Sequence, residues 1–274
     1  MNSYVAKNIE PSGPVPTSRE LFQSYEVNQV KMSDIKKWLT KGLMDLKNKP
    51  LASISYGLVF ALVGIVLSLA AQANPVFVAS AATGFLLAGP FLAIGLYDIS
   101  RRIEKGKQPT SKHSIKAIIK NLIHISIYAI ALGFVMTMWI RISTLVVGFS
   151  VNDAIVTDEG YLALFKSLML MDNGFSLILG LFFVGLIFAV IAFATGVATL
   201  PMLMDKKVDI VTACSTSIRA VLKNPVVMAA WAFAIAVTIG LGIATYYIGL
   251  VILMPLISYA SWHAYRDLVD DKID

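Results

Sequence analysis

An all-α membrane protein with six transmembrane helices is the fold that the sequence predicts. Three observations lead to it: 57% of the 274 residues are apolar, only 15% are charged, and the charged residues are unevenly spread. Soluble domains contain about 45–50% apolar and about 25% charged residues. Residues 50–97, 173–204 and 224–265 contain no Asp, Glu, Lys or Arg. A bilayer-spanning helix needs about 20 apolar residues, so the first and last stretches can each hold two spans.

Turn signals divide these stretches into individual spans. The polar sequence Gln72-Ala73-Asn74-Pro75 separates a span near 51–71 from one near 76–97. A tight turn near Ala244–Tyr247 separates the last two spans. The stretches are continuously apolar rather than alternating, which favours helices over a β-barrel. The four remaining spans are expected near 118–140, 177–200, 226–244 and 247–265.

The basic residues predict the orientation in the membrane. With six spans both termini lie on one side, and 21 of the 23 Lys and Arg residues fall on that side, the exceptions being Arg141 and Lys166. The positive-inside rule makes this side cytoplasmic and predicts a multi-pass membrane protein with both termini in the cytoplasm. The basic excess then indicates contact with anionic lipid headgroups, not with nucleic acid. The large outer segment is expected at about 142–175, with an amphipathic helix over Asp158–Met171.

A threefold internal repeat is also visible in the sequence. The similar segments Leu46–Pro50, Ile119–Leu122 and Leu222–Pro225 each end an amphipathic stretch and begin a span. An aromatic residue follows each segment by six positions, and the second span of each unit contains or meets a proline. The aromatic residues are Tyr56, Tyr128 and Trp231, and the prolines are Pro90, Pro201 and Pro255. Each unit has an even number of spans, so the three units point the same way through the membrane, which excludes an inverted repeat.

These features predict a domain organisation of a tail and three units. A disordered cytoplasmic tail covers residues 1–32, and the transmembrane domain covers residues 33–270. The units are expected at about 33–107, 111–208 and 210–270.

Each unit is expected to begin with an amphipathic helix at the cytoplasmic surface. Ser33-Asp34 is expected to cap the first of these helices. The lysines of the three helices would lie at the headgroups and the apolar faces in the membrane interface, although a docking surface for a partner is the alternative. The apolar faces comprise Ile35, Trp38, Leu39, Leu43 and Leu46 in the first unit, Ile115, Ile118, Ile119 and Leu122 in the second, and Cys214, Ile218, Val221 and Leu222 in the third.

Side chains that carry chemistry are scarce in the predicted spans. Asp98 and Arg141 lie at span ends, and His124 and His263 lie near the cytoplasmic ends of different spans. The two histidines could form a haem or metal pair, but Trp262–Arg266 is typical of an anchor at the membrane interface. The sequence contains no phosphate-binding glycine loop, nucleophile elbow or cluster of metal ligands. We therefore expect no catalytic, cofactor-binding or metal-binding residue, and a colourless protein without a redox cofactor.

Small residues form two adjacent ridges on the predicted fifth span. Residues of this size let a neighbouring helix backbone approach closely. We expect the ridges to be buried against another helix, so that Gly240→Leu lowers the thermal stability through overpacking. One ridge comprises Ala232, Ala236, Gly240 and Ala244, and the other comprises Ala230, Ala234, Thr238 and Gly242.

Several segments resemble a bacterial family of predicted integral membrane proteins, a domain of unknown function. The resemblance covers about residues 36–270. It implies the membrane fold and a location in the bacterial inner (cytoplasmic) membrane, without supplying an active site. Some members are labelled as related to cytochrome c oxidase subunit I. An oxidase core needs six histidines in its spans for two haems and a copper, whereas this chain has only three histidines in all. The segments that carry the resemblance are Gly89-Pro90, Tyr97–Arg101, Leu200–Asp205, Met254-Pro255 and Trp262–Asp267.

The function expected from these observations is non-catalytic. The chain would be a scaffold or accessory subunit of a membrane complex, with a respiratory complex as one candidate. The alternative is a passive transporter or channel for a small neutral solute, with helix kinks at Pro90 and Pro255 lining the path. The expected partners are membrane lipids and other integral membrane proteins or a second copy of the chain. A single cysteine, Cys214, excludes an intrachain disulfide.

Overall fold

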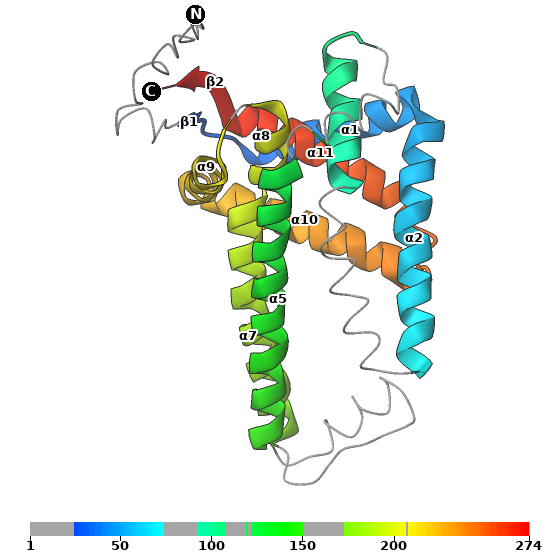
Figure 1. The fold of residues 1–274 in the computed structure, drawn as a ribbon, viewed down its shortest axis with the longest axis vertical. Coiled ribbons are helices and arrows are strands. Elements are labelled where there is room, and N and C mark those ends of the chain that lie inside the picture. Colours follow the sequence, from blue (N-terminus) through cyan, green and yellow to red (C-terminus); the bar gives the residue numbers. More distant parts are fainter. Residues whose placement is uncertain are drawn as a thin grey trace, which may run out of the picture.

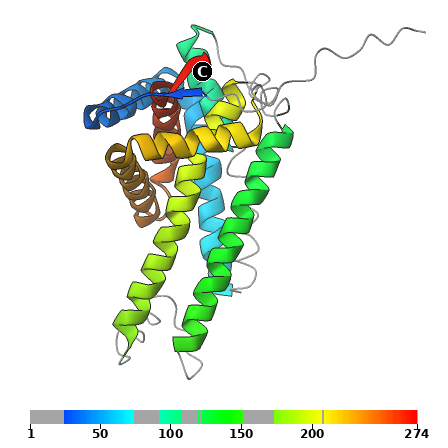
Figure 2. The ribbon, with the colours of Figure 1, turned by 90° about the vertical axis from the view of Figure 1, so that its left-hand side faces the viewer.

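The computed structural model describes residues 25–73, 92–107, 119, 122–150, 173–206 and 208–273. Its three longest helices are α2 (Pro50–Ala73), α5 (Leu122–Ser150) and α7 (Gly174–Gly196), and they follow the long axis of the molecule (Figure 1). Helices α5 and α7 pack side by side (Figure 2). The remaining described helices and a two-stranded sheet gather mainly toward one end of these long helices.

Four helices in the described part of the chain are long and apolar enough to cross a membrane. They correspond to four of the six expected spans, so the membrane-spanning character of the chain is confirmed. Their apolar surfaces are largely exposed, as expected for helices that face lipid. The four segments are Pro50–Leu69, Leu122–Val146, Gly174–Asp205 and Pro225–Ala244.

The two other expected spans are not confirmed. Residues 74–91 lie outside the described residues, so only residues 92–97 of the expected span at 76–97 are described. These residues are helical, and the helix extends to residue 104. Helix α11 (Leu250–Leu268) occupies the position of the sixth span but is not among the four helices apolar enough to cross. Most of its second half is buried inside the protein. The six-span, threefold-repeat architecture therefore stays a prediction.

Helices α10 (Pro225–Ala244) and α11 form a hairpin that crosses the direction of α5 and α7 (Figures 1 and 2). The hairpin turns where the sequence predicts, and Tyr246 and Tyr247 have φ values of 53° and 67°. Residues other than glycine rarely adopt positive φ, so the turn is locally strained. The described helices thus differ from three hairpins aligned in parallel.

Two amphipathic helices precede spans as the repeat predicts. Helix α1 (Met32–Asn48) leads into α2, and α9 (Ile210–Lys223) leads into α10. The joining residues have nearly the same backbone conformation, with φ −136° and ψ 60° at Lys49 and φ −129° and ψ 49° at Asn224. A proline follows each, in the first-turn position that suits its missing N–H. The sequence likeness of these two junctions therefore extends to their backbone conformation.

The N-terminal residues differ from the expected disordered tail. Strand β1 (Tyr25–Val27) pairs antiparallel with β2 (Val269–Ile273), and residues 1–24 lie outside the described residues. The sheet brings both ends of the described chain to one end of the molecule (Figure 1). The predicted cap is wrong in part, because Ser33 lies inside α1 and the Asp34 carboxylate accepts a hydrogen bond from the Lys31 backbone N–H at 2.8 Å.

Helix α5 is longer than the third span was expected to be. It continues beyond residue 140 to Ser150, so Arg141 lies inside the candidate span, close to its end at Val146. The Arg141 side chain is exposed, and a long basic side chain in this position reaches the headgroup region. The expected outer helix over Asp158–Met171 lies outside the described residues.

Helix α11 is the centre of the packing. It contacts α1, α2 and α10, and its aromatic residues Tyr259, Trp262 and Tyr265 are fully buried. Trp38 of α1 and Trp231 of α10 are also fully buried, with ring centroids 5.4 Å apart and planes at 78°. Edge-to-face pairs of this kind stabilise a core beyond the area they bury.

The amphipathic faces are placed partly as predicted. Ile35 and Leu39 pack with Trp38 against the core, whereas Leu43 is exposed. In α9, Ile218 and Leu222 point outward, in keeping with an interfacial face. The buried side of α9 consists instead of small residues, namely Thr212, Ala213, Thr216, Ser217 and Ala220.

Candidate functional site

Polar and charged side chains gather at the end of the molecule that holds the sheet. They come from α1, the helical segment 92–104, α8 (Thr199–Asp205) and α11. They form two groups, which we call the buried cluster and the pocket. The buried cluster is Asp45, Ser100 and His263, and the pocket is the hollow around Asp205.

The buried cluster joins three helical segments through one carboxylate. Oδ2 of Asp45 accepts a hydrogen bond from Ser100 Oγ at 2.5 Å and lies 2.8 Å from Nε2 of His263. Asp45 is 5% exposed, His263 8% and Ser100 0%, so water does not replace these contacts easily. A buried polar group without a partner is costly, so Ser100 and His263 both depend on Asp45 as their common partner.

The order of groups in the buried cluster differs from that of a hydrolytic triad. In a triad, histidine lies between the serine and the carboxylate and removes the serine proton. Here the carboxylate lies between Ser100 and His263 and accepts the serine proton in a hydrogen bond. This arrangement joins α1, segment 92–104 and α11 through polar contacts, with the carboxylate and not the histidine as the partner of Ser100.

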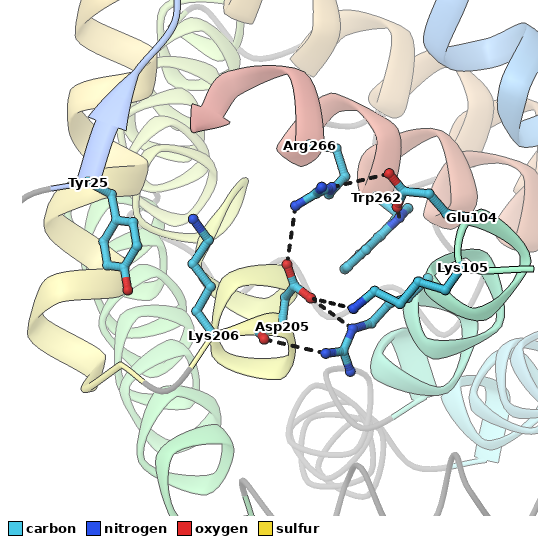
Figure 3. Close-up of a pocket in the computed structure, with 8 residues that line it drawn as sticks. Tyr25, Glu104, Lys105, Asp205, Lys206, Trp262 and Arg266 are labelled. Carbon is cyan, nitrogen blue, oxygen red and sulfur yellow. Dashed lines mark hydrogen bonds and ion pairs between the residues drawn. The ribbon is translucent and has the colours of Figure 1, made fainter. Parts of the chain in front are cut away.

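The pocket is an open hollow of about 370 Å³ whose central group is Asp205. One carboxylate oxygen lies 2.8 Å from Arg101 Nε and 4.0 Å from Lys105 Nζ, and the other lies 3.4 Å from a guanidinium nitrogen of Arg266. Glu104 accepts from Arg266 at 3.3 Å and from the indole N–H of Trp262 at 3.1 Å (Figure 3). Tyr25 and Lys206 complete the lining, with Nζ of Lys206 4.2 Å from the centroid of the Tyr25 ring.

A third contact anchors α1 to the end of α11. Asp267 accepts hydrogen bonds from Lys37 Nζ at 2.8 Å and from the indole N–H of Trp38 at 2.9 Å. Partial burial opposes the charged form of Asp267. The two hydrogen bonds and the positive charge of Lys37 outweigh burial and lower the pKa of Asp267 below its ordinary value.

The lowered pKa of Asp267 makes stability depend on acid pH. A carboxylate with a lower pKa in the folded state stabilises the fold above its unfolded pKa of about 3.9. This stabilisation is lost as the pH falls through the folded-state pKa. We expect the melting temperature in mild detergent to fall on acidification toward and below pH 4. Asp267→Asn can still accept a hydrogen bond from Trp38 but should flatten the dependence of the melting temperature on pH. The control Glu26→Gln, at an exposed position, should leave this dependence unchanged. Equal melting profiles for Asp267→Asn and the wild type would contradict this role of Asp267.

Three aspartates near the ends of the predicted second spans, Asp98, Asp205 and Asp267, each form an ion pair with a basic residue. Asp98 lies within the helical segment 92–104, Asp205 is the last residue of α8, and Asp267 lies in the last turn of α11. The nearest ion-pair distance is 2.8 Å in all three, to Arg102, Arg101 and Lys37 respectively. The sequence placed Asp98 at a span end but did not identify these pairs or Asp45. Asp45 could have been found, because Trp38, Gly42 and Asp45 follow helical spacing on one buried face of α1.

The two histidines have different surroundings. His263 belongs to the buried cluster, whereas Nδ1 of His124 is buried without a hydrogen-bond partner in the described structure. Among the residues that the structure describes, no three His, Cys, Asp or Glu side chains are arranged to hold a metal ion. The Cys214 thiol is half-buried, and burial raises its pKa, so it stays protonated at neutral pH.

The small-residue ridges of α10 are only partly buried. Gly242 is buried, and a Cβ at this position would overlap the side chain of Leu250. Gly240, in contrast, is exposed, and a Cβ there would meet no atom of the described residues within 4 Å. The expectation that Gly240→Leu overpacks a contact within the chain is therefore wrong. The ridge with Ala236, Gly240 and Ala244 faces outward.

The apolar helices and the polar end define the class of the protein: an integral membrane protein with several apolar helices of spanning length. Residues 77–205 match the model of a family described as predicted integral membrane protein (DUF2189). The expected resemblance is thus confirmed over this stretch, which includes Arg101, Lys105 and Asp205 of the pocket and Ser100 of the buried cluster. No curated protein and no solved structure matches the chain.

Proposed function

We propose that the chain is a non-catalytic scaffold or accessory subunit that packs against other integral membrane proteins. It lies in a bacterial inner membrane, with both ends and the polar end of the bundle in the cytoplasm. The observation that carries the proposal is the outward ridge of Ala236, Gly240 and Ala244 on α10, with open space above Gly240. In lipid, ridges of small residues allow close backbone contact between helices.

The alternative function, a passive transporter or channel for a neutral solute, receives less support from the described residues. The pocket described above is lined mostly by charged residues at one end of the molecule, not by apolar spans. A path for a neutral solute would run between the spans, where the exposed faces of α7 and α10 instead offer surfaces for lipid or for other helices.

The test compares two matched glycine substitutions in the full chain. Gly240 and Gly180 both have open space at the Cβ position, so Gly240→Leu and Gly180→Leu should leave the melting temperature nearly unchanged. After purification in mild detergent, the wild type and Gly180→Leu should elute as a larger assembly containing other membrane proteins or further copies of the chain. Gly240→Leu should elute without them. A wild type free of partners, or a Gly240→Leu assembly identical to the wild type, would contradict the proposal.

A further inference from the structure

We propose that the pocket around Asp205 binds a phosphate group, and that its source is the headgroup of an anionic phospholipid. The proposal goes beyond the scaffold function, because it concerns a different part of the molecule and a different kind of ligand.

The charges of the pocket favour an anion. Three cations, Arg101, Lys105 and Arg266, lie within 4.0 Å of a single carboxylate, that of Asp205. The six charged residues of the lining are four basic and two acidic, which leaves an excess of two positive charges. The two carboxylates do not compensate the four cations, so an added anion is attracted to the hollow.

The cations can reach a ligand in the hollow. The side chain of Lys105 is 50% exposed, and those of Arg101 and Arg266 are 26% and 28% exposed, whereas the Asp205 side chain is only 9% exposed. Guanidinium groups bind phosphate oxygens through paired, charge-assisted hydrogen bonds, and an ammonium adds a point charge. The volume of about 370 Å³ is that of a small-ligand site and exceeds the space a bare phosphate needs.

The position of the pocket favours a lipid as the source of the phosphate. Asp205 is the last residue of the candidate span Gly174–Asp205. Arg101 and Lys105 lie at the end of the helical segment 92–104, and the buried indole of Trp262 forms part of the wall. Basic residues and tryptophan at the end of a span lie at headgroup depth, where basic pockets between helices bind anionic lipid.

The test measures binding of three probes to the full-length protein in mild detergent. The probes are short-chain phosphatidylglycerol, short-chain phosphatidylcholine and inorganic phosphate, and the readouts are affinity and the shift in melting temperature. We expect phosphatidylglycerol to bind more tightly than phosphatidylcholine, with an affinity that falls as salt rises. We expect inorganic phosphate to compete only weakly. Equal binding of the two lipids would overturn the proposal, and binding of inorganic phosphate alone would overturn the lipid source.

Two substitutions with opposite signs separate binding from a structural effect. Lys105→Gln should weaken phosphatidylglycerol binding about fivefold, the factor expected for one lysine near an anionic surface. Glu104→Gln, which can still accept from Trp262, removes a negative charge and should tighten binding by a similar factor. Lys107→Gln, an exposed change outside the pocket, should have little effect. Unchanged affinity in both Lys105→Gln and Glu104→Gln would place the lipid elsewhere.

Discussion

Asp45→Ala is expected to lower the free energy of unfolding by about 3–5 kcal/mol, because it leaves two buried polar groups without an acceptor and each such loss costs about 1–3 kcal/mol. The substitution leaves the Ser100 hydroxyl and the His263 ring buried without their common acceptor. It also removes the polar link between α1, segment 92–104 and α11. For a protein of this size, each kcal/mol corresponds to about 2–4 °C, so the melting temperature in mild detergent should fall by about 6–20 °C.

Further variants distinguish the polar link from a general defect of α1. Asp45→Asn keeps an acceptor of the same shape and should fall between wild type and Asp45→Ala. Lys47→Ala removes an exposed side chain from the same helix and should change little. In a double-mutant cycle, Asp45→Ala and His263→Ala should be strongly non-additive, because the second change removes a group already left without its partner. Additive effects would contradict direct coupling of the two residues.

Gly57→Ala is expected to destabilise the protein by at least about 3 kcal/mol, at or above the upper part of the usual range for overpacking. Gly57 lies where α2 crosses the start of α11, and a Cβ at this position would overlap the backbone carbonyl of Val251. A backbone group cannot rotate away as a side chain can, so the helices must separate. Two turns further along α2, a Cβ at Gly64 would overlap the ring of Tyr247, which is a side chain and not backbone.

Gly240→Ala is the matched control for Gly57→Ala. It makes the same change in a helix, but a Cβ at Gly240 meets nothing within 4 Å. Alanine is more favourable than glycine within a helix by about 0.5–1 kcal/mol, so the melting temperature should stay the same or rise slightly. Equal melting temperatures for the two variants would show that α2 does not pack against α11 as described.

Continuous apolar stretches were sufficient to predict the main helices. α2, α7 and α10 lie in the charge-free stretches, and α5 begins in the apolar stretch at 118–140. α1 and α9 lie where helical spacing places them. The predicted helix ends were less accurate where a helix continues beyond the end of its apolar stretch. Segment 92–104 remains helical past Asp98 because basic residues continue the same helix, with Arg102 paired to Asp98 one turn back.

The polar end could not be predicted because its contacts join residues far apart in the chain. Asp45 meets His263, and Lys37 meets Asp267, across more than 200 positions, and neither pair has a local sequence signature. The burial of Gly240 was predicted wrongly for a related reason. A ridge of small residues indicates that a helix can be approached closely, but it does not say whether the approaching helix belongs to the same chain.

We propose that the sheet, the buried cluster and the pocket lie together on the cytoplasmic side of the membrane. Cysteine labelling with a membrane-impermeant maleimide tests it most directly, in bacterial cells that express the protein with Cys214 replaced by serine. Lys107, beside the pocket, and Asp158, outside the described residues, are replaced one at a time by cysteine. In intact cells the reagent should label Asp158→Cys and not Lys107→Cys, which should react only after the cells are permeabilised. Labelling of Lys107→Cys and not of Asp158→Cys in intact cells would contradict the account.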